Sequence, residues 1–183
     1  MKMGQYYIVI ILAEIGTAKN EYIRVYLDTS RYDSGSKLME HSYLDNPLMK
    51  TMEILIGPEG PFYKSRVVWA GDYADPEEDS DQNLYSMVNY EYNETKEYTK
   101  YTVNGPTYSY IINHTKKQYV EKPNKYGYNI HPLSLLTSEG NGRGGGDYRG
   151  NNEYLCGVWA RDVISMENTI PDGYSELICD FHE

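Results

Sequence analysis

The chain has 183 residues, which fits one domain, and its 27 acidic and 17 basic residues give a net charge of −10. Such an acidic surface repels phosphates, so it disfavours direct binding of nucleic acid and of anionic membranes. Tyrosine is abundant, with 21 Tyr against 2 Phe and 2 Trp, and we expect many of these rings to be half-buried with the hydroxyl in water or bonded to the backbone.

The first elements in chain order form a predicted β-hairpin. Tyr6–Leu12 is a continuous apolar run of strand length. The run is too short to cross a membrane, and no small-residue cleavage site follows it, so we expect a buried strand in a cytoplasmic protein instead of a signal peptide. Tyr22–Asp28 alternates between apolar and polar positions, which is the period of a half-buried strand, and a polar link joins it to the first.

A capped helix, a third strand and a second helix follow. Asn46 suits the cap of the first helix, Pro47 its first position and Gly57 its end, and the apolar residues between them recur on one face. Arg66–Ala70 is predicted to be a strand. Ser80 is predicted to cap the second helix, whose inward-facing residues would be Leu84, Met87 and Val88.

The second half of the chain is predicted to be mostly strands. Asn89–Thr107 is polar, rich in tyrosine and without a clear period, which is typical of a mobile insertion. Five strands are predicted here: Tyr108–Asn113, Gln118–Glu121, Leu133–Thr137, Val158–Met166 and Tyr174–Phe181. Cys156 and Cys179 form no disulfide framework, and we expect both to be reduced core residues. These elements predict a single α+β domain over residues 1–183, with a mostly antiparallel sheet, two short helices and a glycine-rich loop.

The glycine-rich loop is the stretch Ser138–Gly150, SEGNGRGGGDYRG. It matches G-x-G-x-x-G, but no helix begins after it and no Gly-Lys-Ser/Thr is present, which excludes a dinucleotide-binding turn and a Walker loop. Successive glycine amides can still form a nest for a nucleotide-like anion. The candidate binding residues in the loop are Gly142, Arg143, Gly144, Gly145, Asp147 and Tyr148, the last by ring stacking. The alternative is a flexible connection that binds nothing.

Two strand ends resemble each other in sequence. Val68-Trp69-Ala70-Gly71-Asp72 is echoed by Val158-Trp159-Ala160-Arg161-Asp162, and each segment carries an aspartate just past a tryptophan that we expect to be buried. Two such ends could face one pocket. Arg161 and Asp162 are therefore added to the candidate ligand-binding residues.

A catalytic alternative centres on His41. The stretch Lys37–Ser42 brings a cation, an acid, an imidazole and a hydroxyl together, and a histidine can act as general base near neutral pH. Asp72 or Asp147 would serve as its partner or as a metal ligand in a hydrolase. The other interpretation is a hydrogen-bonded structural histidine. Neither a zinc pattern nor a complete calcium loop is present, so no metal site and no cofactor are predicted.

Several stretches, in their joint order, resemble a family of small hypothetical proteins from bacteria, phages and other viral or mobile genomes, many of which begin "MGQYY". The stretches are Met3–Tyr7, Lys37–Ser42, Val67–Asp75, Asn113–Lys117, Gly140–Asp147 and Trp159–Asp162. The resemblance implies viral or mobile-element biology. It transfers no activity and no catalytic residue.

The sequence favours binding without turnover, either of an anionic nucleotide-like molecule or of a protein partner. One alternative is the hydrolase with His41 as base. Another is an acidic decoy or virion component, whose acidic face imitates nucleic acid toward a basic partner.

Overall fold

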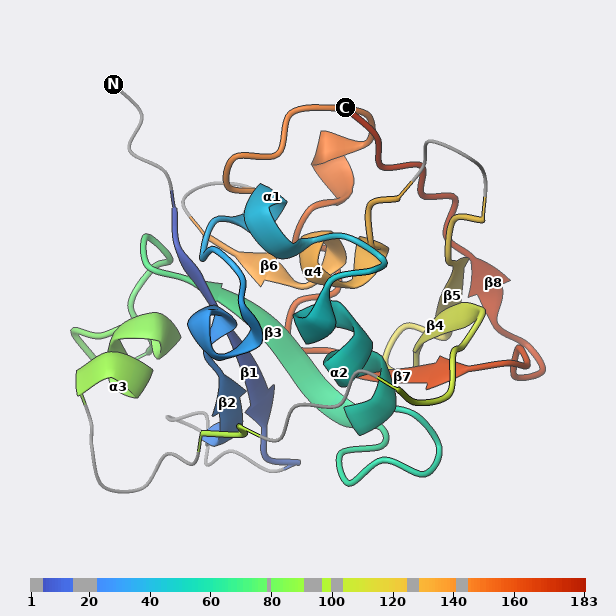
Figure 1. The fold of residues 1–183 in the computed structure, drawn as a ribbon, viewed down its shortest axis with the longest axis horizontal. Helices are drawn as coiled ribbons and strands as arrows, with labels where there is room; N and C mark the ends of the chain where they lie inside the picture. The colour runs from blue at the N-terminus through green and yellow to red at the C-terminus, as the bar shows by residue number, and fades with distance from the viewer. Residues whose placement is uncertain are drawn as a thin grey trace.

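An eight-stranded sheet forms the centre of the protein, with strand order β2-β1-β3-β7-β4-β5-β8 and with β6 beside β3 (Figure 1). The computed structural model describes residues 5–14, 23–78, 80–90, 97–99, 104–124, 129–140 and 145–183. The strands are β1 (Tyr7–Leu12), β2 (Ile23–Leu27), β3 (Ser65–Gly71), β4 (Tyr110–Asn113), β5 (Gln118–Glu121), β6 (Ser138–Glu139), β7 (Val163–Glu167) and β8 (Ser175–Glu176). All pairings except β3–β6 and β5–β8 are antiparallel, which confirms the predicted α+β fold with a mostly antiparallel sheet.

The sheet is buried on both faces at β1 and β3. Val67 and Trp69 face one hydrophobic cluster, whereas Val68 and Ala70 face a second cluster on the other side. All six residues of β1 are buried for the same reason, which explains why the sequence of this strand is apolar without alternation. The predicted hairpin is confirmed, with β1 antiparallel to β2.

The described residues form four helices, which are α1 (Leu38–His41), α2 (Pro47–Leu55), α3 (Leu84–Tyr90) and α4 (Pro132–Leu136). Figure 1 shows α1, α2 and α4 grouped together and α3 apart from them. The predicted cap of α2 is confirmed, because Asn46 Oδ1 accepts from the backbone N–H of Leu48 at 2.9 Å. The predicted cap of α3 is wrong by three residues. Asn83 Oδ1 accepts from Ser86 N at 2.8 Å, while the Ser80 hydroxyl accepts from Gln82 N. Two 3₁₀ turns, η1 (Thr29–Tyr32) and η2 (Glu153–Leu155), complete the helical elements.

The strand predicted over Leu133–Thr137 is in fact the helix α4. Pro132 occupies its first turn, and His131 Nδ1 accepts from Leu133 N at 3.2 Å, so a histidine side chain caps the helix. All five residues of α4 are buried. A short apolar run that is buried on every side cannot be assigned to helix or strand by its period alone.

The two last predicted strands are shorter than expected. Residues 158–162 form turns, in which Arg161 has a φ of 69°, and β7 begins only at Val163. In Tyr174–Phe181 only β8 is a strand, although burial still differs along the stretch, since Phe181 is buried and Ile178 is 78% exposed. The strands predicted at Tyr108–Asn113 and Gln118–Glu121 are confirmed as β4 and β5, which pair antiparallel.

Only part of the predicted insertion Asn89–Thr107 can be located, because residues 91–96 and 100–103 lie outside the described residues. In its described part, Glu97 forms a parallel bridge with Tyr26, and Tyr98 N donates to Tyr26 O at 2.8 Å. These contacts extend the sheet beyond β2. The predicted mobility of the insertion stays a prediction. None of the helices in the described segments has the length and apolar character that crossing a bilayer requires.

Candidate functional site

His41 is fully buried and both of its ring nitrogens are engaged. Nε2 lies 2.9 Å from Trp69 Nε1, and Nδ1 lies 2.9 Å from the backbone oxygen of Gly35. An indole N–H can only donate, so Nε2 carries no proton and Nδ1–H donates to Gly35 O. Burial holds the pKa of His41 below its ordinary value. The ring is therefore neutral and structural, which is the second of the two interpretations of this residue.

The two aspartates proposed as partners of His41 each bind a backbone amide. Asp147 Oδ1 accepts from Met39 N at 3.0 Å, in the first turn of α1, and Asp72 Oδ1 accepts from Tyr6 N at 3.0 Å. Both carboxylates also lie near the Tyr7 hydroxyl, whose pKa is raised first by burial and then by Asp147, Cys156 and Asp72. The structure thus places Asp72 and Asp147 in the same region, near Tyr7, but each of them holds a backbone amide and not His41.

Three residues of the proposed anion nest, Gly142, Arg143 and Gly144, lie outside the described residues. Among the neighbouring glycines, a Cβ atom at Gly145 would lie 3.2 Å from Cys156 Sγ, and one at Gly150 would lie 2.2 Å from the backbone oxygen of His182. At both glycines, the space beside the Cα atom is therefore occupied by other atoms of the protein.

Tyr148 cannot stack on a ligand as expected. Its side chain is 1% exposed, its hydroxyl donates to Asn151 O, and its ring packs edge-to-face on Phe181 with centroids 5.5 Å apart. These contacts fasten the end of the chain to the glycine-rich stretch. The sequence predicts a Tyr148 ring that stacks on a ligand, but a buried ring has no free face for this.

The echoed segments carry the buried tryptophans that the sequence predicts. Trp69 and Trp159 are both fully buried. Asp162 accepts from Asn113 Nδ2 at 2.8 Å and forms an ion pair with Lys116. Neither Asp72 nor Asp162 is among the residues that line the cleft beside β6 and β7, and a pocket shared by the two stays a prediction.

A cleft of about 590 Å³ lies between the segment after β3, strand β6 and the turn before β7. Its charged lining residues are Asp75, Glu77, Glu78, Glu139 and Arg161. The other lining residues are mostly small or apolar, and among them Cys156 is buried and Val158 is 38% exposed. Among the candidate binding residues that the structure describes, Arg161 alone lines this cleft.

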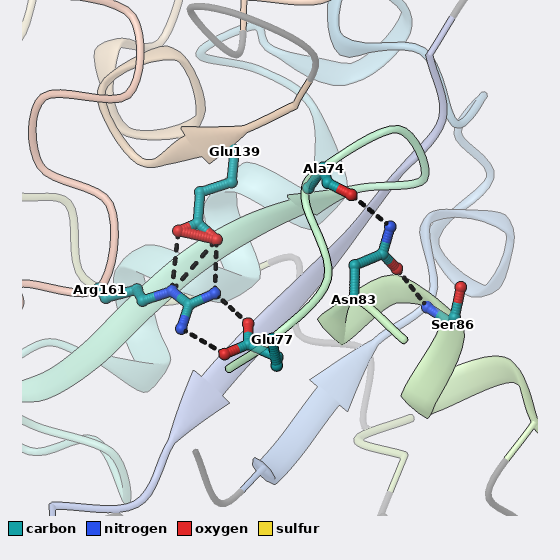
Figure 2. A network of polar contacts seen from close by, with 6 residues as sticks. All are labelled: Ala74, Glu77, Asn83, Ser86, Glu139 and Arg161. Atoms are coloured by element: carbon teal, nitrogen blue, oxygen red, sulfur yellow. Dashed lines mark hydrogen bonds and ion pairs between the residues drawn. The ribbon is translucent and has the colours of Figure 1, made fainter. Parts of the chain in front are cut away.

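Two carboxylates hold the Arg161 guanidinium (Figure 2). Nη1 donates to Glu77 Oε2 at 3.0 Å, Nη2 donates to the other oxygen of Glu77, and Nε donates to Glu139 Oε2 at 2.8 Å. Burial acts to lower the pKa of Arg161, but the hydrogen bonds to Glu77 and Glu139 outweigh it and raise that pKa. The guanidinium is therefore charged, and its charge is more than balanced by its two partners.

Sequence reasoning named Arg161 but missed Glu77 and Glu139. Glu77 lies 84 residues before Arg161 and Glu139 lies 22 residues before it, so no local spacing connects them. Glu139 lies inside the glycine-rich stretch, where no feature of the local sequence indicates that it binds Arg161.

The described residues contain no group of three or more His, Cys, Asp or Glu side chains placed to hold a metal ion. No protein-family model, no curated protein sequence and no solved structure matches this chain. The geometry and charge of the cleft are therefore the features that bear on its function.

Proposed function

We propose that this chain is a non-catalytic binding protein, of viral or mobile-element type, that receives a basic segment of a partner protein in its cleft. The observation that carries the proposal is the charge of that cleft. Four carboxylates line it against one guanidinium, and two of those carboxylates already neutralise the guanidinium. A protein of this origin would meet such a partner in the host cytoplasm.

An anionic ligand fits the cleft poorly. A phosphate would have to compete with Glu77 and Glu139 for Arg161, and it would be repelled by Asp75 and Glu78 nearby. The stacking ring that a nucleotide needs is absent at Tyr148, which is buried. The geometry therefore favours a protein partner over a nucleotide-like molecule.

A hydrolase is also less well supported than a binding protein. His41 has both nitrogens engaged and no exposure, so it has no free lone pair for a substrate or a water molecule. Asp72 and Asp147 accept backbone amides. These roles are consistent with residues that hold a binding surface in shape.

The size and lining of the cleft suit a lysine or arginine side chain. Its volume falls in the range of protein ligand pockets, which is roughly 300–1,000 Å³. Val158 and Pro76 offer apolar contact to the aliphatic stem of such a side chain, while the carboxylates accept hydrogen bonds from its charged end. Oxygen lone pairs of Glu77 and Glu139 that Arg161 does not use remain as acceptors.

A peptide titration tests the proposal. A labelled peptide of alternating lysine and glycine should bind the wild-type protein, and an equally long glutamate–glycine peptide should not. The double substitution Asp75→Asn with Glu78→Gln should weaken binding by about tenfold, since each exposed charge pair contributes roughly 0.2–1 kcal/mol. Fluorescence anisotropy at low and high salt would measure both effects.

The control for this titration carries the same change in net charge far from the cleft. Asp172 and Glu176 are both exposed and belong to the segment around β8. Asp172→Asn with Glu176→Gln should leave peptide affinity nearly unchanged. Equal losses in the two double variants would mean that the peptide senses only overall charge, and the cleft would lose its role.

A further inference from the structure

The segment that follows β3 forms one wall of the cleft. Residues 72–78, here called the strap, leave β3 at Gly71, and Ala74 to Glu78 line the cleft. Asn83 closes the base of the strap, because its Nδ2 donates to Asp72 O at 3.0 Å and to Ala74 O at 2.9 Å. Figure 2 shows the second of these hydrogen bonds. The same side chain caps α3 through Ser86 N, so the base of the strap is fixed to a helix.

Backbone hydrogen bonds tie the strap to the segments that flank it, and Asp72 N donates to Tyr6 O at 3.0 Å beside β1. Ala74 N donates to Gly71 O at 3.2 Å, and Glu77 N donates to Gln82 O at 2.9 Å. The Glu77 carboxylate reaches the opposite wall, where it binds Arg161 with both oxygens.

Arg161 is the rigid side of this contact. Its backbone N donates to Val67 O at 2.8 Å, and its backbone O accepts from Arg66 Nε at 3.0 Å, which ties it to β3. Glu139 on β6 holds the guanidinium from another direction. If Glu77 departs, Arg161 therefore keeps a carboxylate partner, and no uncompensated charge remains in the wall.

We propose that the strap is a cover for the cleft, with the Asn83 contacts as its hinge and the Glu77–Arg161 ion pair as its clasp. A cationic side chain entering the cleft competes with Arg161 for Glu77, so ligand entry and strap opening are coupled. The use of this motion rests on the proposed function, whereas the clasp itself does not. The strap opens over residues 74–78, because Asp72 at its base stays bonded to Tyr6 through its backbone N and its carboxylate.

Hydrogen–deuterium exchange of the protein without any peptide tests the clasp. Glu77→Gln should speed amide exchange in residues 74–78 by about tenfold, which is the effect of losing one partly buried ion pair. Exchange in β1 and β3 should stay at the wild-type rate. Glu78→Gln is the matched control, because it removes the same charge one residue away and leaves the contact with Arg161 intact.

A second variant removes the other half of the clasp. Arg161→Gln should speed exchange in residues 74–78 as Glu77→Gln does. The proposal is overturned if Glu77→Gln and Glu78→Gln exchange alike, or if Glu77→Gln raises exchange throughout the sheet. Since no peptide is present, a strap that opens as expected together with a lysine peptide that fails to bind would reject the proposed function alone.

Discussion

The Tyr7 hydroxyl lies 3.0 Å from the position that a Cβ atom would take at Gly140 and 2.8 Å from the corresponding position at Gly146. The ring cannot easily retreat, because Tyr7 is fully buried at the start of β1 and pairs with Gly71 of β3. Gly146 also has a φ of 55°, which side chains other than glycine seldom adopt. The Tyr7 ring thus explains the glycine at position 146, whereas at Gly140 an added Cβ atom would first meet Gln5 Oε1 at 2.1 Å.

Two glycine substitutions separate backbone strain from this packing. Gly173 has a φ of 83° and no described atom within 4 Å of an added Cβ, so Gly173→Ala should cost only the backbone strain, about 1 kcal/mol. Gly146→Ala should cost about 2 kcal/mol more, because the methyl group would displace Tyr7. Urea unfolding of the two variants measures the difference. Equal free energies of unfolding would show that the Tyr7 ring can move aside without destabilising the protein.

At the scale of single elements, the sequence predicts a helix correctly where both its capping residue and its apolar period are clear. The helix α2 is specified by its own residues, since Asn46 and Pro47 act within one turn. The helix α4 depends on a cap from His131, a residue type that is rarely read as a cap, and its apolar run shows no period. The cleft could not be predicted, because Glu77, Glu139 and Arg161 meet only through the fold.

Helix α2 also carries a buried carboxylate whose ionisation stabilises the fold. Glu53 is 4% exposed; its Oε1 accepts from Lys122 Nζ at 2.7 Å and its Oε2 from His131 Nε2 at 3.1 Å. Burial acts to raise the pKa of Glu53, but the bonds from His131 and Lys122 outweigh it and hold that pKa below the ordinary 4.5. A depressed carboxylate pKa stabilises the folded state above pH 4.5, and this stabilisation is lost as the pH falls through the folded-state pKa.

The expected consequence is a pH-dependent cost of Glu53→Gln. At pH 7 the variant should lose about 3 kcal/mol, since an amide cannot accept from both donors and leaves the Lys122 charge without its partner. The difference in the free energy of unfolding between the variant and the wild type should decrease as the pH falls below 4.5. Glu121→Gln, at an exposed position on β5, is the control and should show a small effect at every pH. A gap that stays constant from pH 7 to pH 3 would contradict the assigned pKa direction.

For the whole molecule, one sheet serves two hydrophobic clusters of unequal size. The larger cluster gathers residues from α1, α2, α4 and most strands, whereas the smaller one joins β1 and β3 to α3. Tyrosine supplies part of this apolar surface. Tyr7, Tyr32 and Tyr148 are almost fully buried with their hydroxyls bonded. Many other described tyrosines, Tyr26 and Tyr110 among them, are half-buried as the sequence predicts.

The two-sided burial of β3 predicts that neighbouring positions respond alike to truncation. Val67 and Val68 face opposite clusters, and both have 0% exposure. Each substitution to alanine should therefore cost about 2 kcal/mol, from the lost transfer free energy and the cavity that remains. Val158→Ala is the control at a position that is 38% exposed, and it should change the free energy of unfolding by less than about 0.5 kcal/mol. Thermal and urea unfolding of the three variants measure these costs.

A neutral Val68→Ala beside a costly Val67→Ala would mean that α3 does not cover its face of the sheet in solution. The strap, whose base is fixed to α3 through Asn83, would then lack its support.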